Sequence, residues 1–285
     1  MVNKNQKIIV ITGATSGIGF KTAFALANLG CKVIIIGKDN SKGIKAVNML
    51  NNINGSNTSL FYNANLSVMN EISELANILN NELDKIDVLI NNVGAIFTKR
   101  TLSTEGIEMT FALNHLSYFL FTNLLLNKIK NSNIGRIINV SSVAHLGAKL
   151  NIDDMECKKN YNLGWKAYSN SKLLNILFTY YLSQNLSKSH ITVNSLHPGF
   201  INSNFGSNNS GFFTSLFNLY KNYAGLSLDE GAKTSVYLAS SKDVDSISGN
   251  YYVKSLKTRS SKISYDLSLQ KKVWNISYEY LSKFM

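Results

Sequence analysis

Short apolar runs rich in Ile and Val recur along the chain and predict buried β-strands. They occupy residues 7–12, 32–36, 59–62, 86–90, 136–140, 191–196 and 251–253. None of them alternates apolar with polar positions, which is typical of parallel strands covered on both faces of a sheet. The pattern therefore predicts a parallel sheet of about seven strands.

The segments between these runs carry apolar residues at spacings of three and four, which predicts amphipathic helices over, for example, residues 68–79 and 173–182. Strands that alternate with helices form right-handed crossovers, which place helices on both faces of the sheet. We therefore expect a doubly wound α/β fold. The chain has a single proline, Pro198, and neither a linker nor an internal repeat, which predicts one domain over residues 1–285.

The composition excludes several classes of protein. Hydrophobic residues make up 45% of the 285 residues, which is far from the range of disordered chains. No apolar run approaches the ~18 residues that a membrane span needs, and the polar start predicts no signal peptide. Cys31 and Cys157 cannot make a disulfide framework, and the four histidines show no metal-site spacing. We expect a cytoplasmic protein without a metal ion.

The chain is strongly basic, with 29 Lys and Arg against 17 Asp and Glu and a net charge of +12. Such a charge suits an anionic ligand, a nucleic acid or an acidic lipid surface. The sequence shows neither a nucleic-acid motif nor basic residues interleaved with aromatic ones, so we expect no nucleic-acid partner. In a C-terminal extension of about 254–285, positive charge is concentrated at Lys254, Lys257, Arg259 and Lys262. We interpret this stretch as a solvated face, which leaves a weak contact with a membrane surface open.

A glycine-rich turn follows the first predicted strand and precedes a helix predicted over residues 22–29. Its glycines, Gly13, Gly17 and Gly19, have the spacing Gly-x-x-x-Gly-x-Gly. Such a turn lets backbone N–H groups approach a pyrophosphate, and the helix dipole favours the negative charge. The segment therefore predicts a dinucleotide site, with an ordinary tight turn as the alternative.

Tyr168 and Lys172 lie four residues apart in a predicted helix, so their side chains share one face. A neighbouring ammonium favours the phenolate, so we expect Lys172 to lower the pKa of Tyr168 and to make it useful for proton transfer. Ser142 can hydrogen-bond the same substrate oxygen, where negative charge develops. In isolation, a tyrosine and a lysine at this spacing would indicate only an exposed helix pair.

Six motifs in order give the chain its resemblance to a known family. Thr12-Gly13-x-x-x-Gly17-x-Gly19 is followed by Asn91-Asn92-Val93-Gly94, Asn114, Ser141-Ser142, Tyr168-x-x-x-Lys172 and Pro198-Gly199. The series resembles the short-chain dehydrogenase/reductases over roughly residues 7–253, with Val93 where the family has alanine. The resemblance implies a Rossmann-type fold and a nicotinamide cofactor.

The resemblance also implies roles for individual residues. Tyr168 would transfer the proton, Ser142 would orient and polarise the substrate oxygen, Lys172 would hold the nicotinamide ribose, and Asn114 would position a relay water. Ser142 is preferred over Ser141 because the family's serine is followed by one residue and then a small one, here Ala144. The implied cofactor contacts are Gly13, Thr15, Ser16, Gly17, Ile18, Gly19, Lys38, Asn65, Leu66, Asn92, Gly94, Tyr168, Lys172, Pro198 and Gly199.

The end of the second strand should decide between NAD and NADP. NAD enzymes carry an acid there for the ribose 2′-hydroxyl, whereas NADP enzymes carry a cation for the 2′-phosphate. The acid position is Gly37 and the cation position is Lys38, which favours NADP(H). Asp39 follows directly and leaves NAD(H) open. Asn65-Leu66 stands at the family's Asp-Leu position beside the adenine.

The sequence around Ser142 and Tyr168, together with His197-Pro198-Gly199, resembles the retinol dehydrogenase and WW-domain oxidoreductase branch. That branch implies a lipophilic alcohol or carbonyl as substrate. A substrate loop is expected at about 199–227, and its apolar stripe fits closure over a substrate, core packing or a contact between subunits of a homo-oligomer equally well. We predict NADP(H)-dependent hydride transfer between a carbonyl and an alcohol. The alternatives are a non-catalytic nucleotide sensor and a nucleic-acid binder.

Overall fold

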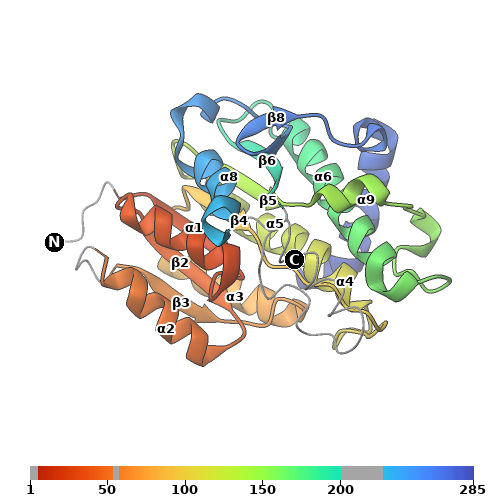
Figure 1. Ribbon diagram of the computed structural model, residues 1–285, viewed down its shortest axis with the longest axis horizontal. Coiled ribbons are helices and arrows are strands. Elements are labelled where there is room, and N and C mark those ends of the chain that lie inside the picture. Colours follow the sequence, from red (N-terminus) through yellow and green to blue (C-terminus); the bar gives the residue numbers. More distant parts are fainter. Residues whose placement is uncertain (1–5, 54–57, 200–226) are drawn as a thin grey trace.

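A computed structural model describes residues 6–53, 58–199 and 227–285 and builds them around one eight-stranded sheet (Figure 1). The strand order is β3-β2-β1-β4-β5-β6-β7-β8, in which the first seven strands run parallel and β8 pairs antiparallel with β7. The strands are β1 (Ile8–Thr12), β2 (Lys32–Gly37), β3 (Leu60–Asn63), β4 (Val88–Asn91), β5 (Arg136–Val140), β6 (Thr192–His197), β7 (Asn250–Val253) and β8 (Leu256–Thr258).

Helices cover both faces of the sheet. They are α1 (Gly17–Asn28), α2 (Asn40–Asn51), α3 (Met69–Glu82), the single turn α4 (Met109–Phe111), α5 (Ser117–Lys130), α6 (Trp165–Asn185), α8 (Leu228–Ser240) and α9 (Leu267–Leu281). A π-helical turn, Ala112–Leu116, joins α4 to α5, and short 3-10 turns include Val143–Gly147 and Lys262–Tyr265.

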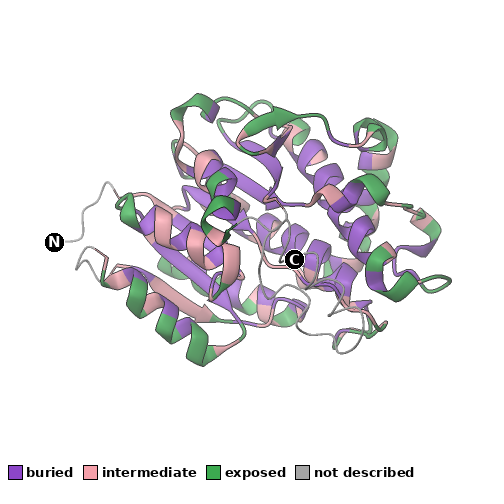
Figure 2. Ribbon diagram, in the orientation of Figure 1, coloured by how far each residue is buried: buried purple, intermediate pink, exposed green. Residues whose placement is uncertain are grey.

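Successive residues of the central strands pack into two hydrophobic cores, one on each face of the sheet. In β1, Val10 packs with α3, α5 and α6, whereas Ile9 and Ile11 pack with α1, α2 and α8. Figure 1 shows α1 and α8 side by side on one face of the sheet. Figure 2 shows the central strands between the two helix layers mostly in purple, as buried residues. This double burial explains why the strands lack polar alternation, and it confirms the predicted doubly wound fold.

All seven predicted strands are present, and the structure adds one strand that the sequence did not reveal. The added strand β8 has three exposed residues and lies at the edge of the sheet, so it carries no buried apolar run. The helix predicted over 22–29 begins earlier, at Gly17, because the glycine turn leads directly into its first turn. The predicted substrate loop lies outside the described residues apart from its ends, Gly199 and Ser227.

The predicted C-terminal extension lies against α6. Its helix α9 packs on α6, and Trp274 meets Phe119 at a ring-centroid distance of 4.7 Å and Phe178 at 5.9 Å. The extension therefore adds to the core beside the helix that carries Tyr168. Among the residues that the structure describes, no helix combines the length and apolarity that crossing a membrane requires.

Candidate active site

The glycine turn packs closely against the loop that follows β4. Gly13 adopts φ +65°, and a Cβ at this position would lie 2.8 Å from Cα of Val93. A Cβ at Gly19 would lie 2.4 Å from the carbonyl oxygen of Gly13. Only glycine fits at either place, because any side chain would force the turn away from β4. The result is a tight backbone cradle at the carboxyl ends of β1 and β4.

Asn92 holds this cradle in place. Its Nδ2 donates to the carbonyl oxygens of Thr12 at 2.9 Å and Gly13 at 3.2 Å, while its main-chain N–H donates to Oγ1 of Thr12 at 2.9 Å. The family resemblance found in the sequence implies that Asn92 contacts the cofactor. The geometry gives it a bracing position between two strand ends.

The cradle leads into the N-terminus of α1. Ser16 is the N-cap residue, its side chain makes no capping hydrogen bond, and the first turn of α1 holds no acidic residue. The positive end of the helix dipole and the leading N–H groups therefore face the cradle without a protein anion to neutralise them. This arrangement suits the pyrophosphate of a dinucleotide.

Gly37 ends β2, Lys38 and Asp39 follow it, and the three residues differ in what they contact. The side chain of Thr15 fills the space beside Gly37, since a Cβ there would lie 2.7 Å from Cγ2 of Thr15. Lys38 is exposed. Asp39 is the N-cap of α2: its Oδ1 accepts from the N–H of Lys42 at 3.0 Å, and these contacts lower its pKa. The capping role gives Asp39 a structural task that is separate from ribose recognition.

Asn65 and Leu66 follow β3. Oδ1 of Asn65 accepts from the main-chain N–H and the hydroxyl of Ser67 at 3.2 and 2.8 Å, and the main-chain N–H of Asn65 donates to Glu71 at 2.7 Å. Leu66 is buried. The side-chain carbonyl oxygen of Asn65 is thus hydrogen-bonded within the turn that starts α3.

Ser142, Tyr168 and Lys172 come together at the carboxyl end of β5. Ser142 directly follows the loop residue Ser141 after β5, while Tyr168 and Lys172 lie one turn apart on α6. A side-chain hydrogen bond joins Ser142 to Tyr168. The Nζ atom of Lys172 lies 5.7 Å from the centroid of the Tyr168 ring. The structure therefore brings Ser142, Tyr168 and Lys172 together, and Asn114 lies close by, since Lys172 Nζ and Asn114 Oδ1 would lie 3.2 and 3.4 Å from a Cβ at Gly94.

Burial shifts the pKa values of this group strongly. It raises the pKa of Tyr168 to about 12, although the hydrogen bond with Ser142 opposes the change. It lowers the pKa of Lys172 to about 7. The expectation that Lys172 lowers the pKa of Tyr168 is wrong for this structure, because desolvation of the phenolate outweighs any effect of the ammonium. Tyr168 consequently holds its proton at neutral pH.

The side-chain amino group of Lys172 is held by a main-chain carbonyl. Its Nζ donates to the carbonyl oxygen of Val140 at 3.1 Å. A Cβ at Gly94 would lie 3.2 Å from the same Nζ, so glycine keeps the space above the lysine open. A side chain at position 94 would therefore crowd Lys172.

The two neighbouring serines have different surroundings. Ser141 is buried, and its hydroxyl donates to the carbonyl oxygen of Lys172 at 2.7 Å, which ties β5 to α6. Ser142 is only partly buried, and its Oγ accepts from the N–H of Ala144 at 3.2 Å. Ser142 therefore keeps a hydroxyl proton for Tyr168 or a substrate oxygen, whereas the proton of Ser141 is already committed.

Asn114 lies in the π-helical turn, a distortion that is frequent at functional sites. Its side chain exchanges two hydrogen bonds of 2.9 Å with the main chain of Ala95, and its Nδ2 also reaches Oγ of Ser171 at 3.1 Å. Its main-chain carbonyl oxygen accepts from Asn175 at 2.9 Å. In this arrangement Asn114 ties the loop after β4 to α6.

The sequence analysis gave no role to His145. The structure places its ring in contact with the main chain of Ser142. Its Nε2 accepts from the main-chain N–H of Ser261 at 3.0 Å, so Nδ1 carries the proton and donates to the carbonyl oxygen of Ser142 at 2.6 Å. Burial lowers the pKa of His145, which keeps the ring neutral. Only the position three residues after Ser142 could have drawn attention to it, because its partner Ser261 lies far along the chain.

Pro198 and Gly199 follow β6, the strand next to β5, and both are partly buried. Gly199 adopts φ +97°, a backbone conformation that favours glycine. Both residues therefore lie at the carboxyl end of β6, on the same edge of the sheet as Ser142.

Comparison with known proteins agrees with this geometry. The family model for short chain dehydrogenases matches residues 7–211. Retinol dehydrogenase 14 of Mus musculus is 36% identical over 283 residues, covering 95% of this chain and 84% of the relative. Polyprenol dehydrogenase of Homo sapiens is 34% identical over 287 residues, covering 96% of this chain and 84% of the relative.

Solved structures share the fold. An uncharacterized protein of Mycobacterium paratuberculosis superposes with a TM-score of 0.76 at 27% identity, covering 97% of this chain and 94% of that one. A short chain dehydrogenase of Escherichia coli CFT073, complexed with NADPH, has a TM-score of 0.67 at 18% identity and covers 88% and 98%.

Fold, strand-end motifs and relatives define one class of enzyme, and the chain belongs to the short-chain dehydrogenase family. Within the family it lies in the retinol dehydrogenase-like branch. It is an NAD(P)-dependent dehydrogenase that acts on CH–OH groups and interconverts a carbonyl and an alcohol.

Proposed function

We propose that this enzyme uses NADP(H) to interconvert the carbonyl and alcohol forms of a lipophilic small molecule. The hydrogen bond between Ser142 and Tyr168, with Lys172 beside them, is the observation that carries the proposal. A nicotinamide cofactor, when bound, supplies or takes up the hydride. The chain's own residues supply the proton, the polarisation of the substrate oxygen and the positioning.

Tyr168 would act as the acid in carbonyl reduction. Since its pKa is raised to about 12, the phenol is protonated at neutral pH and can give its proton to the substrate oxygen as negative charge develops there. Ser142 would donate to the same oxygen. Lys172 would bind the ribose and return a proton to Tyr168, and Asn114 would hold the water through which the lysine exchanges protons with solvent.

The cradle fits a dinucleotide. Gly13 and Gly19 allow close backbone approach, Ser16 to Ile18 open α1, and Gly94 keeps the space above Lys172 open. We propose that these positions, with Thr15, Asn92, Asn65, Leu66, Pro198 and Gly199, line the cofactor site. Lys38 would bind the 2′-phosphate, because it is exposed beside Gly37 while Asp39 caps α2.

The lipophilic class of substrate is supported by the relatives, which are named as dehydrogenases of retinol and polyprenol. We further propose that the chain is a single domain that works in the cytoplasm, where the buried free thiols of Cys31 and Cys157 stay reduced.

NADPH consumption against a panel of aldehydes, ketones, quinones and retinoids tests the proposal. We expect turnover with at least one apolar carbonyl and a slower rate with NADH. NADPH binding without turnover on any member would instead indicate a nucleotide sensor. A faster reaction with NADH would reverse the cofactor assignment.

A further inference from the structure

The C-terminal part of the chain exposes a continuous basic segment. Between Asp245 and Asp266 there is no acidic residue. The four cations of this interval all have exposed side chains: Lys254, Lys257, Arg259 and Lys262. The segment covers the antiparallel strand β8 and the 3-10 turn that follows it, along the top of the molecule in Figure 1 and largely green in Figure 2.

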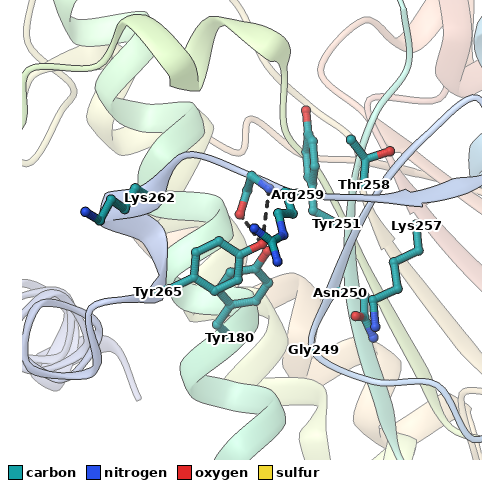
Figure 3. A pocket seen from close by; sticks show the side chains of 10 residues that line it. Tyr180, Gly249, Asn250, Tyr251, Lys257, Thr258, Arg259, Lys262 and Tyr265 are labelled. Carbon is teal, nitrogen blue, oxygen red and sulfur yellow. Dashed lines mark hydrogen bonds between the residues drawn. The ribbon is translucent and has the colours of Figure 1, made fainter.

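Three of these cations line one groove of about 900 Å³ (Figure 3). Lys257 comes from β8, Arg259 follows that strand, and Lys262 begins the 3-10 turn that ends at Tyr265. Tyr180 of α6 and Tyr265 also line the groove. The two tyrosine rings pack at 5.3 Å, and Ser260 contacts both hydroxyls, at 2.7 Å for Tyr180 and 3.2 Å for Tyr265. The groove is therefore a built feature with fixed aromatic walls and a positive rim.

Apolar side chains in the same stretch of chain are also exposed. Leu256, which precedes Lys257, is 69% exposed, Ile263, which follows Lys262, is 44% exposed, and Leu267 at the start of α9 is 63% exposed. Each exposed leucine forgoes the free energy that burial of its side chain would release. Exposed leucines among cations are typical of a surface that lies in a membrane interface, with the charges at the headgroups and the apolar groups in the acyl boundary.

We propose that these residues form a docking surface for an anionic membrane. The docking surface comprises Leu256, Lys257, Arg259, Lys262, Ile263 and Leu267. Lipid phosphates or carboxylates meet the three cations, and the leucines enter the boundary of the acyl chains. The exposed aliphatic groups favour a lipid over a nucleic acid, because single-stranded nucleic acid is bound on open aromatic faces and the rings of Tyr180 and Tyr265 pack on each other.

This surface adjoins the loop that carries Ser142. Ser261, between Arg259 and Lys262, donates to His145, and His145 donates to the carbonyl oxygen of Ser142. A membrane bound here would therefore lie near the catalytic loop, although binding itself requires no turnover.

Vesicle sedimentation of the full chain tests the proposal. The parent should bind vesicles of phosphatidylcholine with about a third phosphatidylserine at roughly 0.1 M salt, and bind pure phosphatidylcholine much less. The triple variant Lys257→Gln, Arg259→Gln, Lys262→Gln should partition on the order of 100-fold more weakly. The pair Leu256→Ser, Leu267→Ser should lose roughly tenfold or more, because two leucines no longer reach the acyl boundary.

A matched triple controls for total charge. Lys45→Gln, Lys130→Gln, Lys188→Gln removes the same three charges from exposed lysines on or next to α2, α5 and α6. It should bind vesicles within about twofold of the parent, since these cations lie off the docking surface. Unfolding midpoints measured for every variant show that the fold is kept.

Three results would overturn the proposal. One is a parent that does not bind the anionic vesicles, or binds neutral ones equally. Another is equal loss of binding in both triples. The third is a basic triple that loses binding to a single-stranded oligonucleotide yet keeps its binding to vesicles. None of these measurements depends on catalysis, so they stand or fall separately from the proposed activity.

Discussion

Ser261 and His145 stand 116 positions apart in the chain, yet the main-chain N–H of Ser261 donates to Nε2 of His145 at 3.0 Å. The other ring nitrogen donates to the carbonyl oxygen of Ser142. The C-terminal extension thereby fixes the loop that presents the Ser142 hydroxyl to Tyr168.

Replacing His145 should therefore lower turnover without removing a reacting group. We expect His145→Ala to reduce kcat by roughly 10- to 100-fold, because a small displacement of Ser142 weakens its hold on the substrate oxygen. KM for NADPH should stay nearly constant. Leu146→Ala, a change at the exposed neighbour, is the control and should leave kcat unchanged. Equal effects of the two changes would remove the positioning role from His145.

The two serines make a direct comparison. Ser142→Ala should lower kcat by on the order of 10² to 10³, the usual cost of one donor to a developing oxyanion. Ser141→Ala should change kcat little and reduce the free energy of unfolding by about 1 kcal/mol, since it loses a buried hydrogen bond. Steady-state kinetics and denaturant unfolding measure both quantities. A larger loss of kcat in Ser141→Ala would show that the serines have been assigned the wrong way round.

Lys38 should set the cofactor preference. Lys38→Ala removes one charge-assisted contact worth roughly 1.5 to 3 kcal/mol, so NADPH should bind about ten- to a hundredfold more weakly and NADH about as before. Asp39→Asn keeps an N-cap on α2 and should leave both affinities nearly unchanged. Titration with each nucleotide measures the ratio. If Asp39→Asn is the variant that shifts the preference toward NADPH, Asp39 reads the ribose and the enzyme is NAD-dependent.

His115 should make stability depend on pH. It is fully buried beside Asn175 and Ser277, and burial lowers its pKa from 6.5 to about 4. Below pH 6.5 the His115 ring binds a proton in the unfolded chain but stays neutral in the folded chain. The free energy of unfolding therefore falls as the pH drops from about 6.5 to 4. The loss from this one residue amounts to about 3 kcal/mol.

Urea unfolding at a series of pH values measures that loss. His115→Gln should make the fall in stability over this range smaller by about 3 kcal/mol. Part of the fall should remain, because burial also lowers the pKa of His197 to about 4. His190→Gln, at an exposed position, should leave the fall as steep as in the parent. A parent whose stability does not change between pH 6.5 and 4 would contradict the neutral buried ring.

The strands and the pairing of Tyr168 with Lys172 could be predicted because both depend on local pattern. Buried parallel strands read as apolar runs, and residues four apart on a helix share a face whatever surrounds them. The pKa of Tyr168 could not be predicted, because spacing shows which groups are neighbours and not how deeply they are buried. The contact of His145 with Ser261 joins two loops, and β8 is a short exposed strand, so neither has a periodic signal.

Turnover by Tyr168→Phe, measured beside NADPH binding, is the decisive test of proton transfer by Tyr168. The change removes the transferable proton and keeps the ring, so we expect carbonyl reduction to be lost while the affinity for NADPH stays within about twofold of the parent. Tyr180→Phe, three turns along α6, loses the hydrogen bonds of its hydroxyl with Ser260, Tyr265 and Ser264, removes no group from the proposed site, and should keep most of the activity. A Tyr168→Phe enzyme whose activity stays within tenfold of the parent would contradict the proposed role of Tyr168 and the mechanism built on it.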